Sequence, residues 1–399
     1  MLIGIVGKTN VGKTTFFSAA TLVEAEIGDR PFVTIKPNEG VGYVRVKSIC
    51  SEFDLKCEPR FGWCNGRYRY VPVKLLDVAG LVPGAHLGKG LGNKFLDDLR
   101  KANVHILIVD ASGATDEEGR PVKPGSYDPL RDAILVKEEF AHWLKGIIQR
   151  NMVNIRRRIE VTKEKPEEVL GDVLSGLGIA KDHVSLAAKE LGLDLPRIAS
   201  WSDDQLLSFA SLLREKTKPM LIAANKIDVP GSEENLEHLK ANLNEPVIPT
   251  SAEAELILRR AASAGLIRYE PGDSGFEIVD ESKLAESQIK ALKLIQERIL
   301  DVYESTGVQE ALDKSLFEMA RYKAVFPVEN ETKLSDKDGR VLPDVLLLPE
   351  DAEVRDVAEA IHTEIAEKAI AGLDARKGIR ISLSYVPKNR DVIRILVRR

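Results

Sequence analysis

Four short segments carry polar residues at spacings that suit the binding of a nucleoside triphosphate. The first, residues 7–14, reads GKTNVGKT and matches G-x-x-x-x-G-K-[ST] between an expected strand and an expected helix. Glycines in such a loop let successive backbone N–H groups converge on a phosphate, and the helix N-terminus adds partial positive charge. We expect Lys13 to bridge the β- and γ-phosphates and Thr14 to offer its hydroxyl to Mg²⁺. The alternative, a plain glycine-rich turn, is disfavoured by the strand–loop–helix context.

The whole phosphate-binding segment contributes candidate nucleotide contacts through its backbone and its first helical hydroxyls. The candidates in this segment are Gly7, Asn10, Val11, Gly12, Lys13, Thr14 and Thr15.

A second segment, Asp77 to Gly80, follows an apolar run ending at Leu76. A carboxylate at a strand end can hold Mg²⁺ through water, and the N–H of Gly80 can sense a γ-phosphate. This D-x-x-G pattern is weak alone, because it also describes an ordinary turn.

The third and fourth segments suit recognition of a purine base. Asn225, Lys226 and Asp228 follow another apolar run. A carboxylate there can accept two hydrogen bonds from the N1 and N2 donors of guanine, which adenine cannot supply, and the stem of Lys226 can cover the base. In the fourth segment, a backbone N–H at Ser251 or Ala252 could meet the guanine O6. The four segments in this order, each after an apolar run, predict guanine nucleotide binding.

The hydrophobic pattern predicts the elements that must hold these segments. Short apolar runs typical of buried strands cover residues 2–6, 71–76, 105–109, 219–224 and 246–249. Helical periodicity is expected over residues 13–22, 130–148, 167–177, 181–191, 203–214 and parts of 283–319. The last part of the chain reads as a strand at 322–328, a long helix at 354–371 and a closing strand at 392–397. This alternation predicts an α/β fold with a mainly parallel sheet, an inserted helical region and a small C-terminal α+β module.

Length and composition limit the function classes. The chain has 399 residues, so at roughly 100–200 residues per domain we expect two to four domains. The 57 Lys and Arg against 62 Asp and Glu give a net charge of −5, which provides no general attraction to nucleic acid and no indication of DNA binding. No apolar run approaches the length of a membrane span. Met1 leads directly into a strand, so we expect no removable leader, and the three cysteines suggest reduced thiols in the cytoplasm.

With these motifs, the sequence resembles the Obg-like family of P-loop GTPases, and within it the YchF-related branch of archaea and fungi. Residues 29–38, DRPFVTIKPN, resemble the switch I segment of the family, and residues 77–96 resemble its glycine-rich segment after D-x-x-G. The C-terminal module resembles a TGS domain, which has a ubiquitin-like fold. The resemblance implies a G domain at 1–110 and 219–320, a helical insertion at 111–218 and a TGS-like domain at 321–399.

The resemblance also implies a mechanism and partners. Thr34 would close on Mg²⁺ and the γ-phosphate, so that Thr14, Thr34 and Asp77 are the expected metal residues, and Lys13, Thr34 and Gly80 the expected catalytic ones. Leu81 stands where Ras-like enzymes have the glutamine that orients water, so we expect slow hydrolysis. By analogy with similar GTPases, Asn10 could help to bind K⁺. The family implies GTP and GDP as ligands and a ribosomal or RNA partner in the cytoplasm.

Two alternatives to this function stay open, and one basic cluster has two interpretations. YchF relatives with an altered base motif use ATP, whereas the regular motif at 225–228 favours GTP. The chain could also be a nucleotide-stabilised RNA- or ribosome-binding module with negligible turnover. Arg156, Arg157 and Arg158 could contact RNA phosphates or form a solvated helix face.

Two further groups have competing interpretations. Cys50, Cys57 and Cys64 recur every seven residues and could hold Zn²⁺ with a fourth ligand, or be scattered free thiols. His86 could reach the γ-phosphate side or be an exposed loop residue.

Overall fold

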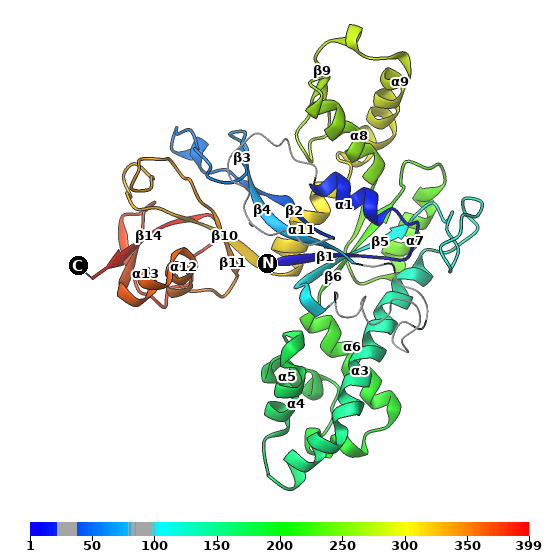
Figure 1. Cartoon of the computed structure of the whole chain (residues 1–399), viewed down its shortest axis with the longest axis vertical. Coiled ribbons are helices and arrows are strands. Elements are labelled where there is room, and N and C mark those ends of the chain that lie inside the picture. The colour runs from blue at the N-terminus through cyan, green and yellow to red at the C-terminus, as the bar shows by residue number, and fades with distance from the viewer. Residues whose placement is uncertain (22–37, 79, 81–83, 85–97, 99, 399) are drawn as a thin grey trace. The chain divides into compact units, whose positions relative to one another are not determined.

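The computed structural model describes residues 1–21, 38–78, 80, 84, 98 and 100–398 (Figure 1). These residues form two compact units. Unit 1 contains Met1, Ala20–Lys74 and Leu312–Arg399, and unit 2 contains Leu2–Ala19 and Leu75–Ala311. The predicted α/β class, the inserted helices and the small C-terminal α+β module are all present.

Unit 2 is built on parallel strands, and the two central strands are buried on both faces. The parallel strands are β1 (Leu2–Val6), β5 (Val104–Asp110), β6 (Met220–Asn225) and β7 (Val247–Thr250), side by side in that order. Every residue of β5 and β6 is buried, which explains their continuous apolar sequences. The full strand order is β2-β4-β1-β5-β6-β7, and the last residues of β4 (Tyr68–Asp77) fall in unit 2. Because parallel strands end at one edge, the segments that follow them meet there.

Helices that follow the strands complete this part of unit 2. They are α1 (Lys13–Thr21), α7 (Ser232–Asn242) and α8 (Ala252–Ser263). After α8 the chain forms a hairpin of β8 (Ile267–Arg268) and β9 (Glu277–Ile278), then α9 (Glu286–Ile295), a π-helical turn at Gln296–Leu300 and α10 (Asp301–Tyr303). Leu258, Leu292 and Ile299 share a small core in this region.

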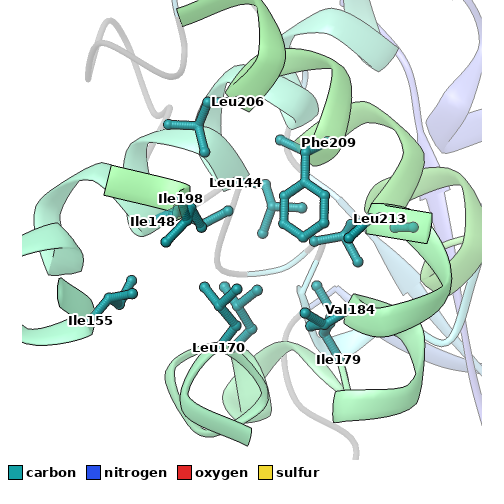
Figure 2. Close-up of a cluster of buried hydrophobic side chains, with 14 of the residues drawn as sticks. Leu144, Ile148, Ile155, Leu170, Ile179, Val184, Ile198, Leu206, Phe209 and Leu213 are labelled. Carbon is teal, nitrogen blue, oxygen red and sulfur yellow. The ribbon is translucent and has the colours of Figure 1, made fainter. Parts of the chain in front are cut away.

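The helices between β5 and β6 have a core of their own. They are α3 (Leu130–Glu160), α4 (Pro166–Leu174), α5 (Lys181–Glu190) and α6 (Asp203–Thr217). Figure 2 shows side chains from these helices, including Leu144, Leu170, Val184 and Phe209, pointing toward one another. The start of α6 carries a capping box, in which the Ser202 hydroxyl accepts from the Gln205 N–H at 3.1 Å.

Unit 1 combines the segment after α1 with the C-terminal part of the chain. Its first part contains β2 (Glu39–Lys47), a 3₁₀ turn (Cys50–Glu52) and β3 (Trp63–Cys64), which pairs antiparallel with β4. Its second part begins in α11 (Val308–Lys314) and continues through a π-helical turn at Ser315–Met319. The two parts are joined by Arg45, whose N–H and Nε both donate to Asp313 at 2.7 Å.

The C-terminal domain of unit 1 is a five-stranded mixed sheet with two short helices. Its elements are β10 (Tyr322–Pro327), β11 (Leu346–Pro349), α12 (Val354–Ile361), α13 (Thr363–Lys368), β12 (Ala369–Asp374), β13 (Ile379–Ile381) and β14 (Asp391–Val397). The strand order is β11-β10-β14-β12-β13, with β10 and β14 parallel. Val325, Val357 and Ile393 are buried together in its core.

Two expectations about elements were wrong or incomplete. The long helix expected at 354–371 is interrupted at His362, whose extended backbone separates α12 from α13 and whose Nδ1 accepts from the Glu364 N–H. Residues 369–371 belong to β12, because they pair with β14. The sequence reading also omitted β2, whose apolar residues alternate with Gly and Arg. None of the helices in the described ranges has the length and apolar character that a membrane crossing needs.

Packing of the inserted helices gives a stability prediction. Leu170 is fully buried, whereas Leu186 on α5 is 51% exposed. We expect Leu170→Ala to destabilise these helices by about 2–5 kcal/mol, because it leaves a cavity, and Leu186→Ala to cost less than about 1 kcal/mol. Hydrogen exchange of peptides from α4 and α6, read by mass spectrometry, measures the difference. Equal acceleration in both variants would contradict this core.

Candidate nucleotide-binding site

The loop between β1 and α1 has a backbone that only glycine can follow at two points. Gly7 and Gly12 have φ angles of 152° and 98°, and Asn10 also has a positive φ of 63°. A Cβ on Gly7 would lie 2.5 Å from the carbonyl oxygen of Ile108 on β5, and one on Gly12 would lie 2.2 Å from Nδ2 of Asn225. The loop is therefore pressed against the ends of β5 and β6, which explains the glycine spacing.

Lys13 begins α1 and lies inside this loop. Its side chain is buried, and its Nζ donates to the carbonyl oxygen of Lys8 at 2.7 Å. Burial lowers the pKa of Lys13, and the nearby carboxylate of Asp77 opposes this shift. A Cβ on Gly80 would lie 3.5 Å from the Lys13 Nζ, so the glycine of D-x-x-G and the lysine of the loop are neighbours. Thr14 is exposed, Thr15 is half-buried and Val11 is fully buried.

Asp77 ends β4 with a carboxylate that the protein alone does not satisfy. Its Oδ1 is buried and has no hydrogen-bond partner in the part of the chain that the structure describes. Burial raises the pKa of Asp77, and the charge of Lys13 acts in the opposite direction. A buried oxygen without a partner is costly, and a carboxylate is a preferred ligand of Mg²⁺ or of its bound water. The donor set of Asp77 and Thr14 therefore fits Mg²⁺.

The last residue of β6 and the segment that follows it are hydrogen-bonded to the phosphate-binding loop. Asn225 is buried, and its Nδ2 donates to the Val11 carbonyl at 2.8 Å. Lys226 has a positive φ of 65°, and its Nζ donates to the Asn10 carbonyl at 2.9 Å and to Asp110 Oδ2 at 2.8 Å. Two of the three expected base-recognition residues thus contact the loop directly.

The same segment is bonded to the one after β7. The Asn225 Oδ1 accepts from the Ala252 N–H at 3.0 Å, and the Asp228 Oδ1 accepts from the Ser251 hydroxyl at 2.7 Å. The Ser251 side chain also caps α8, because its oxygen accepts from the Ala254 N–H. The structure therefore brings the first, third and fourth segments into one hydrogen-bonded group.

Sequence reasoning missed a loop and an ion pair at this site. In the loop after β5, the Gly119 carbonyl accepts from Asn10 Nδ2 at 2.8 Å. At the start of α3, Asp132 pairs with Lys8 at 2.8 Å, and both side chains are buried. The position of Lys8 inside the glycine-rich loop was the one feature of the sequence that could have marked it as a site residue. Its partner could not be found without the fold.

Some expected residues lie outside the described part of the chain or in other surroundings. Thr34 with switch I residues 29–37, Leu81 and His86 lie outside the described residues. In the inserted helices, Arg156 pairs with Glu160 at 2.9 Å and Arg158 pairs with Asp172 at 2.8 Å. These carboxylates neutralise two of the three arginines that we considered for RNA contact.

Family profiles match three parts of the chain. The profile described as "Obg-like GTPase YGR210-like, G4 motif-containing domain" matches residues 223–330, and "50S ribosome-binding GTPase" matches residues 2–139. The profile described as "TGS domain" matches residues 335–397. The second of these profiles covers the phosphate-binding loop and the D-x-x-G segment, and the first covers the segments after β6 and β7. The third covers the C-terminal domain.

Full-length relatives occur in archaea and fungi. The chain is 46% identical over 396 residues to the "Uncharacterized GTP-binding protein MJ1332" of Methanocaldococcus jannaschii, covering 99% of this chain and 98% of that protein. It is 34% identical to the "Uncharacterized GTP-binding protein C428.15" of Schizosaccharomyces pombe, covering 100% and 98%. The "Ribosome-binding ATPase YchF" of Mycoplasma genitalium is 33% identical and covers 62% of each chain.

A solved structure matches the fold along the whole chain. The crystal structure of a GTP-binding protein from Pyrococcus horikoshii OT3 has a TM-score of 0.79 and 36% identity, and covers 100% of both chains. With the profiles and the full-length relatives, this match leads to one conclusion. The chain belongs to the Obg-like family of P-loop GTPases, in its YchF-related branch with a C-terminal TGS domain.

Proposed function

We propose that the chain binds guanine nucleotides, hydrolyses GTP slowly to GDP and phosphate, and acts as a nucleotide-dependent switch linked to ribosomes in the cytoplasm. The observation that supports nucleotide binding most directly is the pair of hydrogen bonds made by the Asn225 side chain. Its Nδ2 donates to the Val11 carbonyl, and its Oδ1 accepts from the Ala252 N–H. The pair links a phosphate-binding loop to a base-recognition loop. The proposed organisation is a G domain at 1–110 and 219–320, a helical insertion at 111–218 and a TGS domain at 321–399.

The residues that would bind the nucleotide have distinct roles. Backbone N–H groups between Gly7 and Thr15 surround the phosphates, and Lys13 contributes positive charge to the β- and γ-phosphates. Asp228 accepts the two guanine donors, and Lys226 covers the base.

The expected contact of the guanine O6 with a backbone N–H at Ser251 or Ala252 has competitors, because the Ser251 N–H donates to the Thr306 carbonyl and the Ala252 N–H to Asn225 Oδ1. Binding of O6 there would require one of these two hydrogen bonds to break or to be shared.

Hydrolysis needs little covalent chemistry from the protein. Thr14, Asp77 and Thr34 would hold Mg²⁺, which neutralises charge on the β- and γ-phosphates when bound. Gly80 and Thr34 would sense the γ-phosphate through their backbone. Leu81 cannot hydrogen-bond a water molecule, so turnover should be slow without a partner. The proposal includes a K⁺ ion held with the help of Asn10, and equal GTP turnover in K⁺ and Na⁺ buffers would remove it.

The contacts of α3 support the switch part of the proposal. Asp132 in its first turn pairs with Lys8 of the phosphate-binding loop, and Glu139 about two turns later accepts from the Gly84 N–H at 2.7 Å. One helix therefore contacts both the loop and the segment after D-x-x-G. If either segment moved when the γ-phosphate binds or leaves, its contact with α3 would change. Because α3 also contributes side chains to the core of the inserted helices, this change would reach those helices.

A ribosomal partner is supported by the match to the 50S ribosome-binding GTPase profile and by the similarity to the ribosome-binding ATPase YchF of Mycoplasma genitalium. Co-sedimentation with ribosomes in GTP-analogue, GDP and nucleotide-free states tests it. We expect retention to depend on the nucleotide in the wild type and to lose that dependence in Lys13→Ala. Equal, weak sedimentation in every state would refute this partner.

Base specificity can be reversed at one position. Asp228→Asn replaces one of the two carboxylate oxygens that would accept from the guanine N1–H and N2–H groups by an amide donor, which suits the O2 of xanthine. The asparagine Oδ1 can still accept from Ser251, so the loop should keep its shape. We expect the ratio of GTP to XTP affinity to fall by about 10–100-fold, the value of a charge-assisted hydrogen bond. Titration with fluorescent nucleotides measures the ratio, and Asp182→Asn on exposed α5 is the control. An unchanged ratio would disprove the assignment.

The unsatisfied carboxylate of Asp77 predicts opposite effects on stability and binding. Because burial raises its folded-state pKa, the folded chain binds more protons than the unfolded chain between the two pKa values. Its contribution to stability is therefore lost as pH rises through that window. Nucleotide-free Asp77→Asn should melt above the wild type at pH 7, and this gain should vanish at acidic pH, where the aspartic acid is protonated.

The same Asp77→Asn variant should bind nucleotide with little dependence on Mg²⁺. Thermal unfolding followed by circular dichroism and titration with and without Mg²⁺ measure the two effects. Asp338→Asn, at an exposed position, should change neither. Reduced melting temperature at pH 7 together with normal Mg²⁺ dependence would show that Asp77 is only structural.

A further inference from the structure

Three cysteines that are spread through a loop converge within unit 1. Cys50 begins the 3₁₀ turn after β2, Cys64 lies in β3, and Cys57 lies in the loop between them. Their three Sγ atoms lie within 4.8 Å of one another. Cys50 and Cys57 are buried, Cys64 is half-buried, and all three thiols are free in the described chain. The fold therefore brings the three cysteines together, which their seven-residue spacing alone could not show.

The sulfur positions suit one metal ion. Cys50 Sγ and Cys64 Sγ are 3.8 Å apart. Two sulfurs at about 2.3 Å from a tetrahedral Zn²⁺ ion are separated by about 3.8 Å. A disulfide would need about 2.05 Å.

A hydroxyl oxygen completes the group as a fourth candidate ligand atom. The hydroxyl of buried Ser48 lies 2.9 Å from Cys50 Sγ, 3.3 Å from Cys64 Sγ and 3.7 Å from Cys57 Sγ. An oxygen at about 2.0 Å and a sulfur at about 2.3 Å from one tetrahedral ion lie about 3.5 Å apart. Ser48 Oγ is thus close to all three sulfurs. Its distances to the sulfurs of Cys64 and Cys57 lie on either side of the value expected of a fourth ligand, and its distance to the Cys50 sulfur is shorter.

A buried positive charge lies opposite this group. Arg69 on β4 is paired directly with Cys64 in the β3–β4 ladder, and only 2% of it is exposed. Its Nη2 donates to the Pro343 carbonyl at 2.7 Å, but its Nε and Nη1 have no hydrogen-bond partner among the described residues. Burial lowers the pKa of Arg69, and negative charge on Cys57 and Cys64 opposes that shift. Three thiolates and one divalent ion carry a net charge of −1, which complements the guanidinium.

We propose that Cys50, Cys57, Cys64 and Ser48 form a structural site for a single Zn²⁺ ion. Binding replaces the three S–H protons, which pass to solvent, by three Zn–S bonds, and no oxidant or reductant is needed. Soft thiolates select Zn²⁺ over Mg²⁺, so this site is separate from the one at Asp77. It extends the chemistry of the protein beyond nucleotide binding and does not depend on it.

The ion would fix a segment that has little regular structure of its own. Between β2 and β4 the chain forms only a three-residue turn and a two-residue strand. This segment nevertheless contacts the C-terminal domain, since Glu52 pairs with Arg376 at 2.6 Å and with Arg390. The Glu58 N–H also donates to the Val341 carbonyl at 2.9 Å. A metal site is a common way to hold such a short segment in one shape.

Metal analysis of the full chain tests the site without any substitution. Protein purified without chelators should contain about one Zn²⁺ per chain by mass spectrometry of the metal. Its three thiols should react slowly with a thiol reagent until a strong chelator is added. Replacement by Co²⁺ should give the visible absorption of tetrahedral thiolate coordination. A chain that contains no Zn²⁺ and takes up none when it is added would overturn the proposal.

Matched variants identify the ligands. Cys57→Ser and Cys64→Ser should lose the bound Zn²⁺ and the Co²⁺ absorption, whereas Ser51→Ala, at an exposed neighbouring position, should keep both. Ser48→Ala should bind Zn²⁺ more weakly by at least about tenfold, as expected when one ligand is lost. Folded cysteine variants that retain the wild-type amount of Zn²⁺ would refute the thiolate site. Unchanged affinity in Ser48→Ala would remove Ser48 from the ligand set.

Discussion

The side chain of Asn225 holds the two halves of the candidate site together. Its amide nitrogen donates to Val11 in the phosphate-binding loop, and its amide oxygen accepts from Ala252 in the base-recognition loop. The contact is so close that a Cβ on Gly12 would lie 2.2 Å from the amide nitrogen. Because Asn225 is buried, losing either partner would leave a polar atom unsatisfied at a cost of about 1–3 kcal/mol. Gly12 of the loop and Asn225 at the end of β6 therefore constrain each other.

The parallel sheet explains why such distant residues meet. The loops that follow β1, β5, β6 and β7 emerge at one edge of the sheet. The order of the parallel strands is therefore enough to bring their segments together. The loop after β5 uses the same edge, where Gly119 bonds to Asn10. From there the chain enters α3, whose Asp132 pairs with Lys8 in a buried ion pair. Breaking such a pair costs about 3–5 kcal/mol, so the inserted helices are tied firmly to the phosphate-binding loop.

Sequence predicted best those features whose signal is local. The strands β1, β5, β6 and β7 were predicted because buried parallel strands have continuous apolar runs. The motif segments could be located because they follow these runs directly, and their roles stay predictions. The helix expected at 354–371 failed because His362 is extended and residues 369–371 gain more from pairing with β14. Lys8–Asp132 and Asn10–Gly119 were missed because each joins residues more than a hundred positions apart. The cysteines stayed ambiguous because their spacing does not reveal the pairing of Cys64 with Arg69 or the hydrogen bond from the Ser48 N–H to the Arg67 carbonyl, which bring the segments of Cys64 and Cys50 together.

Recognition of guanine rather than adenine is the central claim, and competition between GTP and ATP on the wild-type chain tests it most directly. A fluorescent GDP analogue bound in the presence of Mg²⁺ would be displaced by each triphosphate in turn. Since adenine cannot donate to Asp228, the account predicts that ATP is needed at a concentration at least about 100-fold higher than GTP. Displacement by ATP and GTP at similar concentrations would contradict it.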